Sequence, residues 1–435
     1  MQEISCDILV IGAGPAGLLS AISAISKGDI TSNSAKLADK PKVILCDQLP
    51  NFGRKILASG GGRCNLSNLA DLEDYPARFG KNGRFIMPAL YSLSPEYLCY
   101  FFESAGVATN SEGLRVYPKS NKAADVLNAL KKKCSQLGVE ILTNSQVAKL
   151  TFDNDQSPTQ CMGAIFSDDK KIVAKSTIIA TGGKSYPELG AAGTGYELAK
   201  SAGHKIVKPL PAGTGLITKP AFAEIAGTQL AEANIKIVLP RQSKAGISGE
   251  VLFSHKGITG PAPLDLSTQI ARLLDDPKVD SVPVELQVIA GKTVDDWQST
   301  LENWRENSGK TLIVNLIKRE VSATFAKFLC TKSGIPHDCQ ACQISAKARN
   351  SLCENLGRLK LSVTKTEGFS KAFVTTGGVN LKKVNPKTLA SKLIAGLFFA
   401  GEVLDLDGTC GGFNLQWAFS SGYLAGISAE EFANS

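Results

Sequence analysis

The sequence lacks any run of about 18 apolar residues, the length that a membrane-spanning helix needs, so we expect no transmembrane segment. Its first residues, MQEISCDILVIGAG, carry neither a basic stretch nor a small-residue cleavage site, so we expect no secretory signal and a cytoplasmic protein. Internal repeats and low-complexity tracts are also missing. These absences favour an ordinary globular protein, as do a hydrophobic fraction of 43% and a charged fraction of 20%.

Length, cysteine content and charge narrow the choice further. A chain of 435 residues is too long for one compact core and predicts about two or three domains. Its eleven cysteines are scattered and odd in number, which indicates reduced thiols and not a disulfide framework. The net charge of +8 comes without a long basic block, so it favours a solvated basic surface over a nucleic-acid partner, although it is compatible with anionic ligands.

The first thirty residues predict a dinucleotide-binding unit. The apolar run Cys6–Ile11 is typical of a buried strand, and it leads directly into a GxGxxG motif made by Gly12, Gly14 and Gly17. Apolar residues at helical spacing follow and end near Gly28. In such a unit the first glycine permits the turn, the second lets a pyrophosphate approach, and the third lets helix and strand pack.

An acidic residue at the end of the next strand fits the same unit. The run 42–46 predicts that strand, and Asp47 follows it, where a carboxylate can bind a ribose hydroxyl. Asp47 lies further from the motif than the usual spacing of about 20 residues. We interpret the polar segment 29–40 as a surface insertion that accounts for the difference.

The end of the chain favours FAD over a nicotinamide as the nucleotide. A predicted strand, Gly396–Ala400, is followed by Gly401 and Glu402, and then by a glycine-rich loop and a helix that begins near Phe413. An acid and a helix N-terminus supplied there can complete a site for an extended cofactor, because they can bind ribityl hydroxyls and stabilise negative charge on the flavin ring. No complete second Rossmann unit for NAD(P)H is visible.

The stretch GRKILASGGGRCNLSN, residues 53–68, first admits several interpretations: a phosphate cradle, a redox-cysteine loop, a metal loop or a surface turn. Its place just after Asp47 favours a second polar cradle along the cofactor. Arg54 and Lys55 suit anionic phosphates, the triple glycine lets the backbone approach closely, and Asn65 can bind the pyrimidine edge of the flavin.

The sequence resembles the aminoacetone-oxidase-like family of bacterial FAD flavoproteins, a branch of the glutathione-reductase-type two-domain flavoproteins. The resemblance covers almost the whole chain and is carried by DILVIGAGPAGL (7–18), GRKILASGGGRCNLSN (53–68), ATGGKSYPELGAAGTGYELAKSAGH (180–204), LFSHKGITGPAPLDLS (252–267), TTGGVNLKKVNPKTLASK (375–392) and GLFFAGEVLDLDGTCGGFNLQWAFSSG (396–422).

The resemblance also implies the organisation of the chain. It predicts an α/β fold with a Rossmann-like FAD-binding domain built from both chain ends (1–204 and 361–435, the second part returning through a β-rich segment). An inserted β-barrel-like domain (205–275) and a small helical domain (276–360) would interrupt it and cover the flavin as a substrate lid. Short alternating runs such as 233–239, and Trp297, Leu301 and Trp304 at helical spacing, agree with these two insertions.

The motifs and the resemblance together predict which residues bind FAD. Val147 is expected at the adenine, Thr181–Gly183 under the cofactor, Glu402 at the ribityl–phosphate region and Gly412–Leu415 at the isoalloxazine. The full predicted set is Gly12, Gly14, Pro15, Ala16, Gly17, Asp47, Gln48, Arg54, Lys55, Ser59, Gly60, Gly61, Gly62, Asn65, Val147, Thr181, Gly182, Gly183, Gly401, Glu402, Gly412, Phe413, Asn414 and Leu415.

Three further features have competing interpretations. Cys64 lacks a second cysteine a few residues away, so a buried side chain beside the flavin is favoured over a dithiol. His337, Cys339 and Cys342 form HxCxxC without a second CxxC, which favours free thiols over zinc, and we expect no metal. His255 is the candidate general acid or base, although the alternative, a loop residue hydrogen-bonded near a helix N-terminus, is favoured.

The sequence therefore predicts an FAD-dependent oxidoreductase that transfers a hydride at flavin N5 to or from a small molecule. The resemblance leaves two directions open: oxidation of small amines by O2, or reduction of an unsaturated or keto substrate with NAD(P)H as electron donor. Two alternatives remain, a flavin-containing RNA-modifying or RNA-binding protein and a redox-sensing interaction protein. A clustering of Lys and Arg beside the flavin site would favour RNA.

Overall fold

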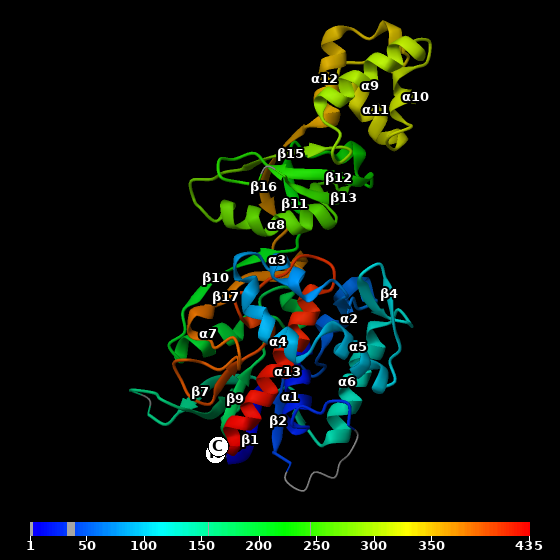
Figure 1. Ribbon diagram of the computed structural model, residues 1–435. Helices are drawn as coiled ribbons and strands as arrows, with labels where there is room; N and C mark the ends of the chain where they lie inside the picture. The colour runs from blue at the N-terminus through cyan, green and yellow to red at the C-terminus, as the bar shows by residue number, and fades with distance from the viewer. Residues whose placement is uncertain (1–2, 33–39, 155, 244) are drawn as a thin grey trace. The chain divides into compact units, whose positions relative to one another are not determined.

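A computed structural model describes residues 3–32, 40–154, 156–243 and 245–435, and it divides the chain into two compact units (Figure 1). Unit 1 comprises Met1–Pro209 and Phe373–Ser435, and unit 2 comprises Leu210–Ala372. Most of the insertion predicted at 29–40 lies outside the described residues. The mixed α/β fold, with a Rossmann-like unit drawn from both ends of the chain, is as predicted.

The core of unit 1 is a seven-stranded sheet of strand order β6-β2-β1-β9-β8-β7, with β18 also paired to β9. Five of its strands run parallel: β1 (Glu3–Ile11), β2 (Val43–Cys46), β6 (Glu140–Leu142), β9 (Lys171–Ile179) and β18 (Leu397–Phe399). The other two form antiparallel pairs: β8 (Cys161–Phe166) with β9, and β7 (Val147–Phe152) with β8. The central strands are buried on both faces, which is why their sequences read as continuous apolar runs.

Helices pack on this sheet. Figure 1 shows α13 (Phe413–Asn434, red) beside α1 (Pro15–Ile25, blue), and α6 (Ala123–Leu137) packs against α1 as well. Gly138 ends α6 in the left-handed conformation. The remaining elements of unit 1 are α2 (Arg54–Ala58), β3 (Ser67–Asn68), α3 (Tyr75–Arg78), α4 (Met87–Ser92), α5 (Pro95–Ser104), β4 (Thr109–Glu112), β5 (Arg115–Pro118), α7 (Thr194–Ser201), β10 (Ile206–Ala212) and β17 (Val374–Val379).

Unit 2 is built on a closed antiparallel barrel. Its strands follow the order β11 (Leu216–Lys219), β14 (Gly257–Thr259), β13 (Ile247–Phe253), β12 (Gln229–Ile237), β15 (Val282–Gln287) and β16 (Leu359–Thr366). The helices of unit 2 are α8 (Pro261–Leu274), α9 (Val294–Asn307), α10 (Ile313–Ile317), α11 (Ala323–Lys332) and α12 (Ala346–Gly357). One hydrophobic core runs through the barrel and the helices.

The barrel extends beyond the boundary predicted at residue 275. Its last two strands, β15 and β16, lie in segments that we expected to be the helical domain and the start of the returning segment. The helices α9–α12 are inserted between these two paired strands, and they share the barrel's core. The change from β to helical sequence therefore marks an insertion within unit 2. No helix among the described residues is long and apolar enough to cross a membrane.

Candidate flavin-binding site

The turn between β1 and α1 has an open position where a pyrophosphate is expected. A Cβ added at Gly14, the N-cap of α1, would meet no atom within 4 Å. A Cβ at Gly17 would lie 1.8 Å from the Gly12 carbonyl oxygen, and Gly12 itself has a φ of 102°. Gly12 and Gly17 are thus required by the fold, whereas the space at Gly14 is free. Pro15 and Ala16 begin α1, whose N-terminus has no side-chain cap and no acid in its first turn.

Asp47 lies at the carboxyl end of β2, beside this turn. One of its carboxylate oxygens accepts a hydrogen bond from the Ala13 N–H at 2.8 Å, and the other accepts the Leu49 N–H at 2.9 Å. The Ser145 N–H donates to the Asp47 carbonyl oxygen at 2.8 Å, which brings the start of β7 at Val147 close to the acid. Gln48 donates instead to the Gly190 carbonyl oxygen at 2.8 Å. The structure therefore groups Asp47 and the segment leading to Val147 near the Gly12–Gly17 turn.

The stretch 53–68 adopts a conformation that needs its glycines. After α2, Gly60, Gly61 and Gly62 follow one another with φ values of 56°, 65° and 88°, which residues with a Cβ rarely adopt. The Ser59 carbonyl oxygen accepts the Cys64 N–H at 3.0 Å and closes the loop. All three glycines are exposed, and their place beside a cofactor stays a prediction.

Cys64 is buried, and burial raises the pKa of its thiol to about 12. A thiol of this kind is protonated at neutral pH and is a poor nucleophile. Neither Cys64 nor Cys410 is in a disulfide, and the same holds for the cysteines of the HxCxxC stretch. Among the described residues no group of His, Cys, Asp and Glu is arranged to hold a metal.

Glu402 is held by three groups that are remote in sequence. Its Oε2 accepts a hydrogen bond from Lys55 Nζ at 2.5 Å, and its Oε1 accepts from Ser185 Oγ at 2.7 Å and from the Thr375 N–H at 2.8 Å. Lys55 also donates to Ser185 Oγ at 2.7 Å. Both charged side chains are largely buried, with exposures of 25% for Lys55 and 20% for Glu402. The acid is fixed and neutralised, and Oε2 retains a lone pair for a hydroxyl group.

This arrangement gives Lys55 and Arg54 partners that the sequence did not suggest. Lys55 uses two of its three N–H donors on Glu402 and Ser185, which leaves one for a phosphate or another acceptor. The exposed Arg54 donates to the Glu188 carbonyl oxygen at 3.1 Å. Their contact with cofactor phosphates stays a prediction.

The two glycine-rich loops of the chain, 59–68 and 408–412, lie against each other. Asn68 donates to the Gly411 carbonyl oxygen at 2.8 Å. With its amide oriented to satisfy its neighbours, Asn65 accepts the Gly412 N–H at 3.1 Å and donates to the carbonyl oxygens of Ser67 and Val116. Asn65 therefore joins the loop to the N-terminus of α13, and its contact with a flavin edge stays a prediction.

Side chains at the start of α13 fix the second loop. Asn414 accepts the Gly408 N–H at 2.7 Å and donates to the Gly408 carbonyl oxygen at 2.8 Å. The buried ring of Phe413 meets Tyr75 edge-on, 5.0 Å between centroids, and Leu415 is half-buried. Gly401, with a φ of 75°, donates its N–H to Ser421 of the same helix. The N-terminus of α13 is capped by no side chain, so it can face an anionic group.

The segment Thr181–Gly183 follows β9, in the middle of the sheet. Thr181 Oγ1 is buried and has no hydrogen-bond partner among the described residues. A Cβ at Gly182 would meet nothing within 4 Å, whereas one at Gly183 would lie 2.4 Å from Thr375 Oγ1. An orphaned buried hydroxyl and two open glycines, Gly14 and Gly182, fit a chain that leaves room for a dinucleotide.

Two smaller sequence-based expectations have different outcomes. The spacing of Thr194 and Glu197 predicts a capping box, and this prediction is wrong: Gly193, with a φ of 78°, is the N-cap of α7, and Glu197 pairs with Lys200. The helix starts there because the left-handed position before it suits a glycine. His255 is exposed in the turn between β13 and β14, in unit 2, and its role as an acid or base stays a prediction. Gly260 caps α8 as expected.

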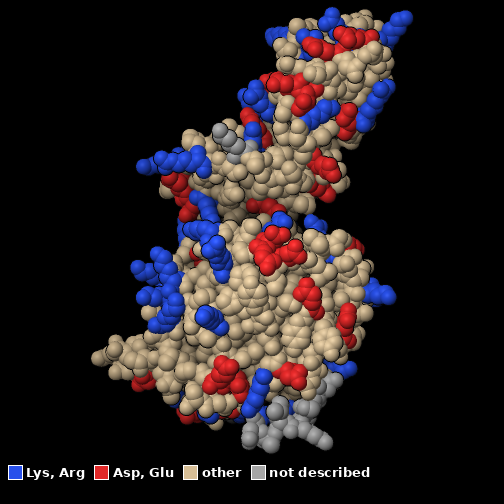
Figure 2. Space-filling view, viewed as in Figure 1, with Lys and Arg blue, Asp and Glu red and all other residues tan. Residues whose placement is uncertain are grey.

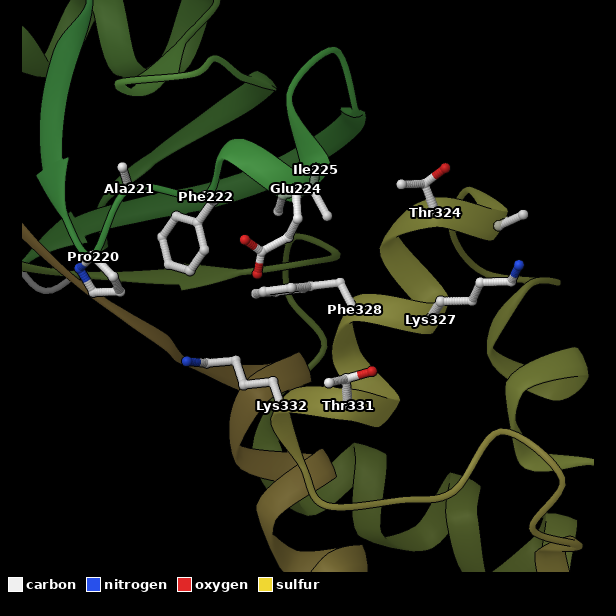
Figure 3. Close-up of a pocket in the computed structure, with 11 residues that line it drawn as sticks. Pro220, Ala221, Phe222, Glu224, Ile225, Thr324, Lys327, Phe328, Thr331 and Lys332 are labelled. Carbon is white, nitrogen blue, oxygen red and sulfur yellow. The ribbon is translucent and has the colours of Figure 1, made fainter.

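Sequence reasoning missed a pocket of about 830 Å³ that lies wholly within unit 2 (Figure 3). It lies between residues 220–225 and helix α11. Phe222 and Phe328 meet edge-on at 5.5 Å, and the ammonium group of Lys332 lies within about 6 Å of both rings. The pocket includes none of the predicted FAD-binding residues.

Comparison with known proteins identifies the family. The model of the HI0933-like protein Rossmann domain matches residues 6–428. The chain belongs to the HI0933-like family. A 3-dehydro-bile acid delta(4,6)-reductase of Clostridium scindens is 32% identical over 97% of this chain and 98% of its own length. A ribosomal RNA dihydrouridine synthase of Haemophilus influenzae is 28% identical over 98% of this chain and 99% of its own length, and one of Escherichia coli is 29% identical over 96% of each.

Solved structures of flavoproteins share the fold. A flavocytochrome c3 fumarate reductase superposes with a TM-score of 0.52 at 19% identity, covering 99% of this chain and 79% of that protein. A 3-ketosteroid-delta4-(5alpha)-dehydrogenase of Rhodococcus jostii gives a TM-score of 0.51 at 14% identity, covering 99% and 98%. Family and fold together make this HI0933-like chain an FAD-dependent oxidoreductase. The narrower aminoacetone-oxidase-like assignment is not confirmed.

Proposed function

We propose that this HI0933-like protein is a reductase that saturates a carbon–carbon double bond conjugated to a carbonyl group in a ring. The observation that carries the proposal is that its relatives, matched over nearly their full length, are named for reductions of this kind. A delta(4,6)-reductase of a 3-dehydro compound acts on double bonds conjugated to a ketone. A dihydrouridine synthase acts on the uracil double bond beside a ring carbonyl. The shared chemistry favours reduction over amine oxidation.

The residues gathered in unit 1 support an FAD site. We assign the pyrophosphate to the open position at Gly14 and the N-terminus of α1, and the adenosine ribose to Asp47. Glu402 would accept a ribityl hydroxyl on its free lone pair, held in place by Lys55, Ser185 and Thr375. The segment 60–65 and the N-terminus of α13 would hold the isoalloxazine ring.

Each of these groups would have its own role in the proposed reaction. FAD, when bound and reduced, would supply the hydride for the β-carbon of the conjugated double bond, and the α-carbon would take a proton. The N-terminus of α13 would stabilise negative charge on the ring through its N–H groups and dipole. The neutralised Lys55–Glu402 pair would orient the cofactor without adding net charge beside its phosphates. His255 remains the sequence-based candidate for the proton donor.

A small molecule is the first candidate substrate, because the relative with the highest identity of the three is named for a bile acid. NADH or NADPH is the expected source of electrons, as in the reductase alternative drawn from the sequence. A nicotinamide nucleotide that reduces the flavin and then dissociates does not require a second Rossmann unit in the protein.

The direction of the reaction can be tested on the purified protein under anaerobic conditions. We expect NADH or NADPH to bleach the bound flavin and a conjugated cyclic enone to restore its colour, whereas the saturated ketone should not. The oxidised protein mixed with small primary amines should keep its colour. Bleaching by an amine, together with no reoxidation by any enone, would reverse the proposal in favour of an oxidase.

The second candidate is the same reduction on a uracil ring within RNA. Two relatives are named as ribosomal RNA dihydrouridine synthases. A specific feature of unit 1 also supports it: exposed lysines gather on one face of this unit. Incubation of the reduced protein with ribosomal RNA, followed by nucleoside mass spectrometry, would detect dihydrouridine.

A further inference from the structure

Two stretches of the chain that contribute to unit 1 contain lysines and no acids. Between Glu197 and Glu224 the sequence has no Asp or Glu, and the same holds between Glu367 and Glu402. Apart from Lys200, which pairs with Glu197, six lysines from these stretches belong to unit 1 and are exposed: Lys205, Lys208, Lys382, Lys383, Lys387 and Lys392. We call these six residues the lysine face.

Backbone contacts bring the two stretches together. The Asn380 N–H donates to the Lys205 carbonyl oxygen at 2.9 Å, and the Lys392 N–H donates to the Lys383 carbonyl oxygen at 2.8 Å. A Cβ at Gly377 would lie 2.4 Å from the Lys208 carbonyl oxygen, which places β10 directly beside β17. Figure 2 shows blue side chains gathered on the side of this unit where Figure 1 labels β10, β17 and α7. The clustering is therefore a property of the fold.

Two of the acids that flank these stretches in the sequence are engaged in ion pairs. Glu197, the acid that precedes the first stretch, pairs with Lys200 at 2.7 Å, and Glu402, which follows the second, pairs with Lys55. The lysine face thus presents a concentrated positive charge, which suits a partner with closely spaced negative charges. A nucleic-acid backbone has this character, because its phosphates repeat along each strand.

The lysine face is also connected to the predicted flavin site by one strand. Thr375, near the start of β17, donates its N–H to Glu402, and Asn380, just after the end of β17, contacts Lys205. These two points are about 16 Å apart along an extended strand. A structured RNA bound to the face can therefore extend to the cofactor-binding residues of the same unit.

We propose that the lysine face binds the phosphate backbone of RNA and positions a nucleotide for reduction. The inference rests on the second candidate function, and it concerns binding, which can be measured without turnover. An anionic membrane would present charge as well, but the relatives favour RNA, since two of them are named for ribosomal RNA.

The test compares two quadruple variants of the full-length flavoprotein that lose the same charge. One replaces Lys382, Lys383, Lys387 and Lys392 with Ala, and the control replaces the exposed Lys81, Lys119, Lys122 and Lys132 of unit 1 with Ala. Binding of a fluorescein-labelled RNA stem-loop with unpaired uridines is followed by anisotropy over a range of salt concentrations. Flavin content and enone reduction are measured on the same preparations.

We expect the first variant to bind the stem-loop at least about tenfold more weakly, with a slope of log Kd against log salt that is smaller by about three. The control should bind like the wild type, and both variants should keep their flavin. Equal weakening in both variants, unchanged binding in the first, or preferential binding of phosphatidylserine vesicles over RNA would overturn the inference. A failure of enone reduction with the expected RNA result would instead count against the small-molecule function alone.

Discussion

At the scale of single residues, the glycines of unit 1 differ in whether the fold leaves room for a side chain. Gly12 and Gly17 have no such room, because the backbone of the turn, or of the residues just after β9, fills the space. Gly14 has an ordinary φ of −79° and open space around its Cα. A substitution at Gly14 therefore tests the cofactor site without straining the protein.

For Gly14→Val we expect a folded protein that has lost its FAD, because the side chain occupies the space assigned to the pyrophosphate. The ratio of flavin to protein absorbance measures the loss, and thermal unfolding of the apoproteins measures the fold. Gly17→Ala is the matched comparison: its Cβ clashes with the Gly12 carbonyl, so it should destabilise the apoprotein itself by about 1–3 kcal/mol. Normal flavin content in folded Gly14→Val would refute the assigned turn.

Lys55 offers a second test at this scale. In Lys55→Met, Glu402 keeps its charge but loses its counter-ion, which should weaken FAD binding roughly tenfold, since a hydrogen bond to a charged group contributes about 1.5–3 kcal/mol. Titration of apoprotein with FAD gives the dissociation constant. The neighbouring Arg54→Met removes an exposed guanidinium and should leave the constant close to that of the wild type. Equal effects of the two changes would mean that Lys55 acts only through long-range charge.

The thiols allow a third test. Burial raises the pKa of Cys64 to about 12, so at neutral pH its reactive thiolate is scarce, whereas Cys342 is exposed. Alkylation of the native protein with iodoacetamide, followed by peptide mass spectrometry, should label Cys342 first and Cys64 only after unfolding. Early labelling of Cys64 would revive the redox-cysteine interpretation.

At the scale of elements, the site depends on how closely α1 and α13 approach each other. A Cβ at Gly422 would lie 2.2 Å from the Ala16 carbonyl oxygen, and one at Gly426 would lie 2.1 Å from Ser23 Oγ. Glycines on one helix thus let it contact the backbone of the other. In the proposed FAD site α1 and α13 both present their N-termini to the cofactor, so the separation of the helices would set the distance between the two anion-binding ends.

Gly422→Ala should therefore lower the apoprotein's stability by about 1–3 kcal/mol, because it forces the helices apart. Flavin retention should fall in parallel. Glu431→Ala, on an exposed position of the same helix, should change neither quantity measurably. Differential scanning calorimetry measures the stability of the apoprotein, and the flavin absorbance ratio measures flavin retention. Unchanged values for Gly422→Ala would show that the helices can separate at no cost.

At the scale of the whole molecule, the sequence predicted local patterns well and distant partners poorly. The β1–α1 turn, α9 around Trp297 and the start of α13 follow from periodicity and glycine placement, and all are confirmed. The closure of the barrel by β15 and β16 was missed, because which strands pair is decided by the folded chain and not by local composition.

In the candidate site, too, local features could be predicted from the sequence and contacts between distant residues could not. That Glu402 and Gly412 belong to one unit with Gly12 could be inferred from motif order, but the pairing of Lys55 with Glu402 joins residues 347 positions apart. Likewise, the sequence has no long basic block near Lys205 or Lys382. The residues of the lysine face come together only in the folded chain. The absence of acids in residues 198–223 and 368–401 was the available signal for the lysine face.

The central claim is that this HI0933-like flavoprotein reduces a conjugated ring double bond, and a single-turnover experiment tests it most directly. The FAD-loaded protein is reduced stoichiometrically without oxygen, freed of donor, and mixed with a cyclic enone or with ribosomal RNA. We predict one saturated product, either the ketone or dihydrouridine, for each flavin reoxidised, and none with apo Gly14→Val. Flavin that is reoxidised only by O2, with no saturated product from either substrate, would contradict the account.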